Sequence, residues 1–263
     1  MAVELRVIAA DVLRARENNK SWFTRHAIAA GLRAGANFAH SNFARADLSK
    51  ANLRGANLEY ANCNDANLTN ADLRNTGLEV AQFEQADLSF SDLRGAFIGE
   101  HPIALWATFK RARCYQADFS NCKLNMTAFD GAMLFEAEFV SAALNYSGFS
   151  DANCSSANFS GASLRHAQFI ESDLTCSKFN GADLQSAILT DVDAGGADFS
   201  GANLAGAFAS GAMLNASNLS NADLTNADLR GCDLEHAVLD GAILSGARFA
   251  GAVMPNGRAV PWD

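Results

Sequence analysis

A period of five residues governs this chain from residue 36 to residue 254. A small residue, most often Ala, recurs at every fifth position, and the second residue after it is nearly always Leu or Phe, as in Ala46-Asp47-Leu48. We call this large residue the centre of the repeat. Because five matches neither the two-residue period of a strand nor the 3.6-residue period of a helix, the pattern predicts a repeat architecture.

A second period of twenty lies on top of the first. Twenty residues are four repeats, which predicts a four-sided coil with one pentapeptide on each side. The centres and the small residues would point inward and fill a narrow tube. Stacked coils would pair as parallel ladders ~4.8 Å apart, and the array predicts about 11 coils. Three columns of centres carry the twenty-residue period: Phe109, Phe129, Phe149 and Phe169; Phe119, Phe139, Phe159, Phe179 and Phe199; Leu124, Leu144, Leu164, Leu184, Leu204, Leu224 and Leu244.

The pattern A-(D/N)-(L/F)-x-x resembles the pentapeptide-repeat family over about residues 36–254. The resemblance implies an all-β fold, a right-handed quadrilateral parallel β-helix. A solenoid repeat cannot bury its own face, so such an array is stable only as a stack with capped ends.

Both ends of the chain are expected to cap this stack. Residues 1–35 are predicted to form an N-terminal helical cap, because Leu5, Ile8 and Val12 belong to an amphipathic stripe. Residues 255–263 are predicted to form a C-terminal capping tail, in which Val260 and Trp262 fold back over the last layer.

The repeat loses its phase once. Eleven residues separate the centres Ile98 and Phe109, where ten would keep the five-residue register. The sequence therefore predicts a loop over residues 99–108 that leaves the wall of the rod.

Charge and composition narrow the range of functions. The formal net charge is −9, and the positive excess of residues 1–35 leaves the repeat array more acidic than the whole chain. An acidic rod repels nucleic acid, so no direct nucleic-acid binding is expected, and it attracts basic proteins. A second interpretation is that Asp before each centre serves corner hydrogen bonds and solubility.

Nothing in the sequence suggests catalysis, a cofactor or a membrane. There is no nucleophile–base motif, phosphate-binding loop or dinucleotide fingerprint, so we expect no enzyme, no catalytic residues and no cofactor. No C-x-x-C pair occurs, which argues against a metal site, and five of the six cysteines fall at inward positions. No apolar run is long enough for a membrane span, and a cytoplasmic location is the default expectation.

Two outward features exceed the polar background of the repeat. The first is a candidate protein-interaction patch, in which the inserted segment contributes the first three residues: Ile103, Leu105, Trp106, Tyr115, Met133 and Phe135. Exposed apolar patches often mark interaction sites, although the loop could instead fold over Tyr115 and Phe135. Met126 and Tyr146 form a similar pair on the opposite side of the square.

The second feature is a candidate charged ladder: Arg54, Arg74 and Arg94, with Glu59 and Glu79 one side further on. Stacked like charges repel, so pairing of Arg with Glu around the corner is the expected purpose. An acidic ligand on the arginine column is the alternative interpretation.

The sequence favours a non-enzymatic scaffold that binds a protein partner of unknown identity through its outer faces. The family resemblance implies an alternative, a DNA-mimicking protein that binds a topoisomerase such as gyrase and protects it. No C-terminal helix like the one through which such proteins dimerise is visible, so a monomer or a weak homodimer is expected.

Overall fold

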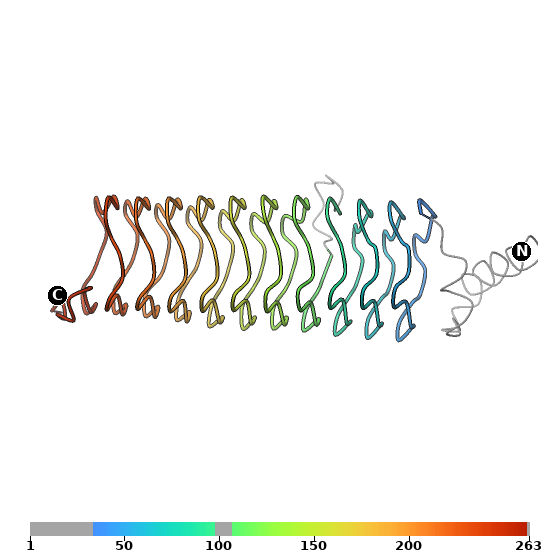
Figure 1. Ribbon diagram of the computed structural model, residues 1–263, viewed down its shortest axis with the longest axis horizontal. Helices are drawn as coiled ribbons and strands as arrows, with labels where there is room; N and C mark the ends of the chain where they lie inside the picture. The colour runs from blue at the N-terminus through green and yellow to red at the C-terminus, as the bar shows by residue number, and fades with distance from the viewer. Residues whose placement is uncertain (1–33, 98–106, 262–263) are drawn as a thin grey trace, which may run out of the picture.

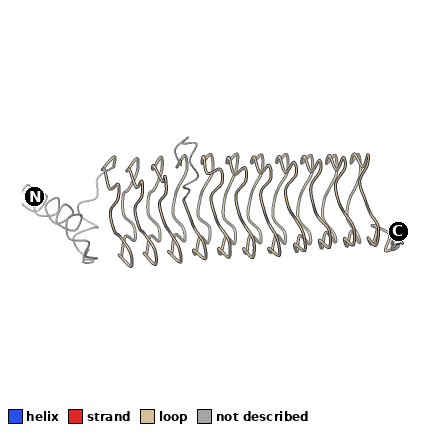
Figure 2. Cartoon of the chain, turned by 180° about the vertical axis from the view of Figure 1, so that it is seen from behind, coloured by secondary structure: helices blue, strands red, loops and turns tan. Residues whose placement is uncertain are grey.

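The computed structural model describes residues 34–97 and 107–261, which form one rod of stacked coils (Figure 1). Within these residues no helix forms, and each repeat contributes a single bridge residue in place of a longer strand, so the rod is drawn as loops and turns throughout (Figure 2). The predicted helical cap over residues 1–35 lies almost entirely outside the described residues and stays a prediction.

Away from the insertion described below, each coil contains twenty residues, as the sequence predicts. The residue before each centre forms a parallel bridge with the residue twenty positions later, for example Asn37 with Asn57. Two backbone hydrogen bonds flank this bridge: the amide of Phe38 donates to the Asn57 carbonyl at 2.7 Å, and the amide of Asn57 donates to the Ala36 carbonyl at 2.9 Å. The four sides of the coil therefore form four parallel ladders along the rod.

The corners are tight turns with one left-handed residue. The amide of each small residue donates to the carbonyl of the preceding centre, as Ala46 does to Phe43 at 2.9 Å. The second residue after the centre has a positive φ in every described turn up to Gly251, including Val80 at 57° and Phe90 at 62°. A type II turn requires this conformation, which glycine and asparagine adopt most readily.

Asp and Asn before the centre accept a hydrogen bond that closes the same corner. In the repeat centred on Leu58, Asn57 Oδ1 accepts the amide of Glu59 at 2.8 Å, and Asp118 Oδ1 accepts the amide of Ser120 at 2.9 Å. This Asx geometry is the reason that short polar side chains recur there. Much of the rod's acidity therefore serves its corners, as the second interpretation of the charge held.

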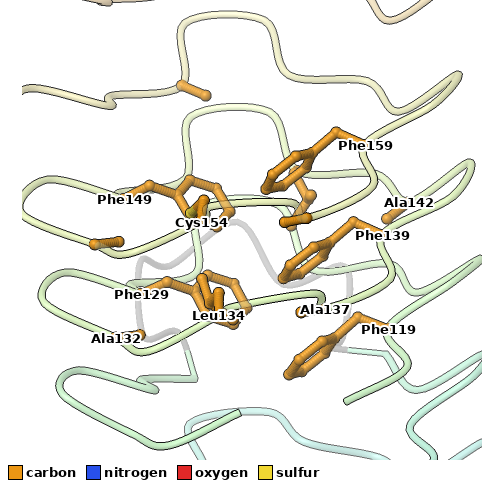
Figure 3. Close-up of a cluster of buried hydrophobic side chains, with 14 of the residues drawn as sticks. Phe119, Phe129, Ala132, Leu134, Ala137, Phe139, Ala142, Phe149, Cys154 and Phe159 are labelled. Atoms are coloured by element: carbon orange, nitrogen blue, oxygen red, sulfur yellow. The ribbon is translucent and has the colours of Figure 1, made fainter. Parts of the chain in front are cut away.

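The centres fill the tube completely through the middle of the rod. The predicted stack of Phe139, Phe159 and Phe179 is confirmed: neighbouring ring centroids lie 4.7 and 4.8 Å apart, with the planes 3° from parallel. Figure 3 shows Phe119, Phe139 and Phe159 of this column one above another. A second phenylalanine column meets this one edge to face, as Phe149 does Phe159 at 5.6 Å. The five cysteines at inward positions are buried and Cys176 is exposed, also as predicted.

The insertion is longer than its phase suggests. Gln82 bridges Thr108, and Phe83 stacks on Phe109 with centroids 4.9 Å apart, so this coil contains 26 residues in place of twenty. Six residues are therefore extra, not one, and the bridge residues Phe97 and Thr108 belong to successive sides. The sequence count was wrong because a six-residue insertion and a one-residue insertion shift a five-residue period equally.

The C-terminal tail folds back on the last coil. Val253 and Ala259 form an antiparallel bridge, and the amide of Val260 donates to the Ala252 carbonyl at 2.7 Å. The predicted return of Val260 is confirmed, whereas Trp262 lies outside the described residues. The tail follows only one of the four sides.

Candidate protein-interaction surfaces

The four faces of the rod are named here by their centres in the middle coils. They follow one another along the chain in this order: face 1 contains Phe109 and Phe129, face 2 Cys114 and Leu134, face 3 Phe119 and Phe139, and face 4 Leu124 and Leu144. On each face the residue before the centre lies at the middle of the wall, and the two residues after it form the corner. A side chain's face therefore follows from its position in the chain.

Three residues predicted for the apolar patch lie together on face 2. Met133 precedes its centre, whereas Tyr115 and Phe135 follow theirs in successive coils. Tyr115 Oη donates a hydrogen bond to Met133 Sδ at 2.7 Å, and both Met133 and Phe135 are exposed. This bond ties the phenol to the thioether on the same face as Phe135.

Phe90 completes this surface, although the sequence analysis omitted it. The amide of Phe90 donates to the Tyr115 carbonyl at 2.8 Å, so the two residues are neighbours in adjacent coils, and Phe90 is 55% exposed. They are 25 residues apart in the sequence. They become neighbours because the coil between them contains six extra residues, which the sequence analysis did not count. We define the face 2 patch as Phe90, Tyr115, Met133 and Phe135.

The described wall is interrupted at a different corner. Phe97, the last described residue before it, lies on face 4, and Ala107 resumes the wall on face 1. The corner between faces 4 and 1 is diagonally opposite the corner of Tyr115 and Phe135. Ile103, Leu105 and Trp106 lie outside the described residues, so the face 2 patch rests on described residues alone.

Met126 and Tyr146 lie in one column at the corner between faces 4 and 1. The same column contains two stacked ring pairs. The ring centroids of His40 and Tyr60 lie 4.7 Å apart, and those of Tyr146 and His166 lie 4.8 Å apart. Stacking occupies ring faces that a partner would otherwise contact, and Tyr146 remains 54% exposed. This column is a second apolar feature, but unlike the face 2 patch its rings already stack on one another.

The charged ladder is organised differently from the prediction. Arg74 pairs with Asp72 at 2.6 Å and with Asp92 of the next coil at 3.5 Å, and Arg94 pairs in the same way with Asp92 and Asp118. The predicted pairing with Glu59 and Glu79 around the corner is wrong, since no ion pair joins either glutamate to an arginine in the described part of the chain. Arg54 heads the same column, and no ion pair is found for it within those residues.

The reason is the geometry of face 3. An arginine just after the centre lies beside the aspartate just before it, and the guanidinium of Arg74 donates two hydrogen bonds to that carboxylate. These hydrogen bonds lower the pKa of Asp72. Arg74 and Arg94 thus neutralise acids of their own face, which argues against an acidic ligand at these two arginines.

The described residues offer little for chemistry on small molecules. No group of three or more His, Cys, Asp or Glu among them could hold a metal ion. No helix forms among the described residues, so none of them belongs to a helix that could cross a membrane. Burial raises the pKa of the Cys63 thiol to about 12, so this inward cysteine is an unreactive core residue.

Comparison with known proteins identifies the repeat. A sequence profile of pentapeptide repeats matches in eight copies over residues 34–62, 61–97, 112–145, 152–191, 195–231 and 217–255. No curated protein sequence matches the chain.

The solved structures similar to this chain belong to the same class. HetL, a pentapeptide repeat protein involved in heterocyst differentiation regulation from Nostoc sp. strain PCC 7120, is 29% identical, with a TM-score of 0.53 over 95% of this chain and 98% of HetL. QnrB1, a plasmid-mediated fluoroquinolone resistance protein, is 19% identical, with a TM-score of 0.32 over 71% of this chain and 85% of QnrB1. The similarity to HetL, which extends over nearly the full length of both chains, supports the fold assigned to this chain.

Proposed function

Because the chain belongs to the pentapeptide-repeat family, whose proteins are generally non-enzymatic structural or interaction proteins, we propose that it is a non-enzymatic scaffold. In this proposal it binds a protein partner through side chains displayed on its outer faces. The observation that carries the proposal is the face 2 patch. It places three exposed apolar side chains and a tethered tyrosine together on one wall of the rod.

The composition of the patch suits recognition of a protein. Aromatic residues and methionine are enriched at interfaces, because they bury a large area at a modest entropic cost. A hydrogen bond from Gln116 Nε2 to Glu136 Oε2, at 2.6 Å, borders the patch on the corner between faces 2 and 3. An apolar centre with a polar border is the usual anatomy of a binding surface.

The alternative function, mimicry of DNA toward a topoisomerase, has one supporting observation. Asp151, Glu171 and Asp191 occupy successive turns of one corner column, between faces 1 and 2, so three exposed acids are aligned along the rod. The aspartates before the centres add less to such mimicry, because they close corners or pair with arginine, as Asp92 does with Arg94. We therefore place the scaffold first.

The test compares partner capture by the native protein and by the double variant Tyr115→Ser with Phe135→Ser. The proposal expects a partner that the native rod retains and the variant loses, with an unchanged thermal midpoint. Tyr146→Ser is the matched control, because it removes an exposed aromatic side chain on a different corner. Equal capture by all three proteins would place the binding site elsewhere.

A second arm tests the topoisomerase alternative directly. Purified gyrase is assayed for supercoiling with the rod present, with and without a quinolone. Inhibition or protection that weakens steeply with salt, and that Asp151→Asn with Glu171→Gln reduces, would favour DNA mimicry over the scaffold. No effect at micromolar rod would leave the scaffold.

A further inference from the structure

The two ends of the described rod differ in how well the tube is closed. At the first coil, Phe38 is 6% exposed and Leu48 is 1% exposed, so the centres are buried. At the last coil, the centre Leu244 is 36% exposed, and the centres Leu239 and Phe249 are only partly buried. The C-terminal end thus exposes apolar side chains that the same positions bury everywhere else.

The backbone of the last coil is also incompletely paired. In every earlier coil the amide of each described centre donates to the following coil. The amides of Leu239, Leu244 and Phe249 have no acceptor among the described residues, and the carbonyls of Ala237 and Ala242 have no donor there. Exposed groups of this kind are a template for pairing with another chain.

The tail shows how this edge accepts an added segment. On face 2 it is bound in the antiparallel direction: Val260 N–H donates to the Ala252 carbonyl at 2.7 Å, and Met254 N–H donates to the Arg258 carbonyl at 2.8 Å. The edge therefore presents one acceptor before its bridge residue and one donor after it. Two such edges in antiparallel orientation complement each other, because each donor meets the other's acceptor.

The open edge opposite the tail is on face 4. It consists of Ala242, Ile243 and Leu244, and Ile243 is 52% exposed. No charged residue lies within these three positions, so two copies could approach without like-charge repulsion. A tail bound on face 2 does not obstruct face 4, although it keeps the remaining sides of two copies apart.

We propose that face 4 of the last coil is a self-association site, at which residues 242–244 of two copies pair antiparallel about a two-fold axis. The Leu244 amide of each copy donates to the Ala242 carbonyl of the other, and the contact covers both Leu244 side chains. A two-fold contact uses the same surface on both copies and closes at the dimer. Growth into a filament would need an open first coil, and its centres are buried.

The experiment measures the mass of the full chain by sedimentation velocity between about 1 and 500 µM, a range suited to a small interface. The proposal expects a shift from 27.8 kDa to twice that mass as concentration rises. Ile243→Glu places like charges across the two-fold axis and should keep the protein monomeric throughout. Phe208→Glu is the matched control, since Phe208 also precedes a centre and is also 52% exposed, and it should dimerise like the native chain.

Hydrogen exchange provides an independent measurement on the native protein. The Leu244 amide should exchange rapidly at low concentration and at least tenfold more slowly at high concentration, whereas the buried ladder amide of Leu164 should not change. A native mass of 27.8 kDa at every concentration would overturn the proposal. So would a dimer that survives Ile243→Glu, or one that Phe208→Glu abolishes equally.

Discussion

The middle and the C-terminal parts of the rod have the same backbone but different interiors. One column of phenylalanine rings stacks without a gap from Phe109 to Phe169. A second column stacks from Phe119 to Phe199, where Phe179 lies 5.0 Å from Phe199. From Leu204 to Leu244 the centres are Leu or Ala, and a cavity of about 10 Å³ opens beside Ala209. The bridges nevertheless keep their twenty-residue register through both parts, so the period and the small inward residues set the backbone while the centres decide how well it is filled.

A buried charge should have the largest effect and should distinguish the closed interior from the open end. Leu164→Asp places a carboxylate where the native side chain is fully buried, and we expect a loss of more than about 4 kcal/mol, enough to unfold the rod. Leu244→Asp, the same exchange in the last coil, should cost about 1 kcal/mol, because water reaches that position. Thermal melts of the two variants check this; similar midpoints would contradict an interior that closes away from the end.

Removal of one ring should show what the stack contributes. Phe159 lies between Phe139 and Phe179, so Phe159→Ala deletes a ring with stacked neighbours on both sides and should cost about 3–5 kcal/mol. Ala209 shows that an alanine centre is compatible with the fold in the leucine part. Urea denaturation measures the loss; a cost below about 1 kcal/mol would mean that the stacked part relaxes as readily as the leucine part.

A larger buried side chain should change the stability of the rod in opposite directions in the two parts. Ala209→Leu should stabilise the rod by about 0.5–2 kcal/mol, because the cavity beside it is lined by apolar side chains only and is at the lower limit for a water molecule. Ala157→Leu makes the same change at a small position of the phenylalanine part and should destabilise by about 1–3 kcal/mol through overpacking. The midpoints of the two variants should move in opposite directions, and a common sign would refute the difference in packing.

Acid should weaken the C-terminal part through one carboxylate. The guanidinium of Arg230, at 2.7 Å, and then that of Arg248 lower the pKa of Asp228 to about 2, although partial burial opposes them. A lowered pKa stabilises the folded state above the unfolded value of about 3.9, and this stabilisation is lost as the pH falls from there through about 2. After allowance for the exposure of both arginines, the effect is about 1–2 kcal/mol.

Comparison of thermal midpoints at pH 6 and pH 2.5 checks the contribution of Asp228. The native protein should lose more stability between these values than Asp228→Asn, which retains the corner hydrogen bond but carries no charge to titrate. The matched control is Asp198→Asn, which changes an aspartate at the same repeat position. An equal pH response of the native protein and the Asp228 variant would contradict the pairing.

The sequence predicted the parts of this molecule that depend on counting. The stack of Phe139 on Phe159 follows from a separation of twenty residues and requires no knowledge of side-chain geometry. The ladder partners could not be counted, because Arg74 reaches aspartates on its own face and the reach of a guanidinium is a matter of conformation. Phe90 was missed for a related reason: a five-residue period cannot distinguish one extra residue from six.

The register that stacks Phe83 on Phe109 has a consequence for how such a protein changes length. Insertion or deletion of twenty residues, one whole coil, shifts the rest of the rod along its axis by one coil spacing of ~4.8 Å and does not rotate it. A gain or loss of five residues instead turns the remainder by a quarter revolution and presents different side chains to any partner. The six extra residues of the insertion do neither, since the coil closes in register beyond them. Binding surfaces can therefore be shifted along the axis by whole coils, and a corner can take an insertion, while the orientation of the surfaces relative to one another is preserved.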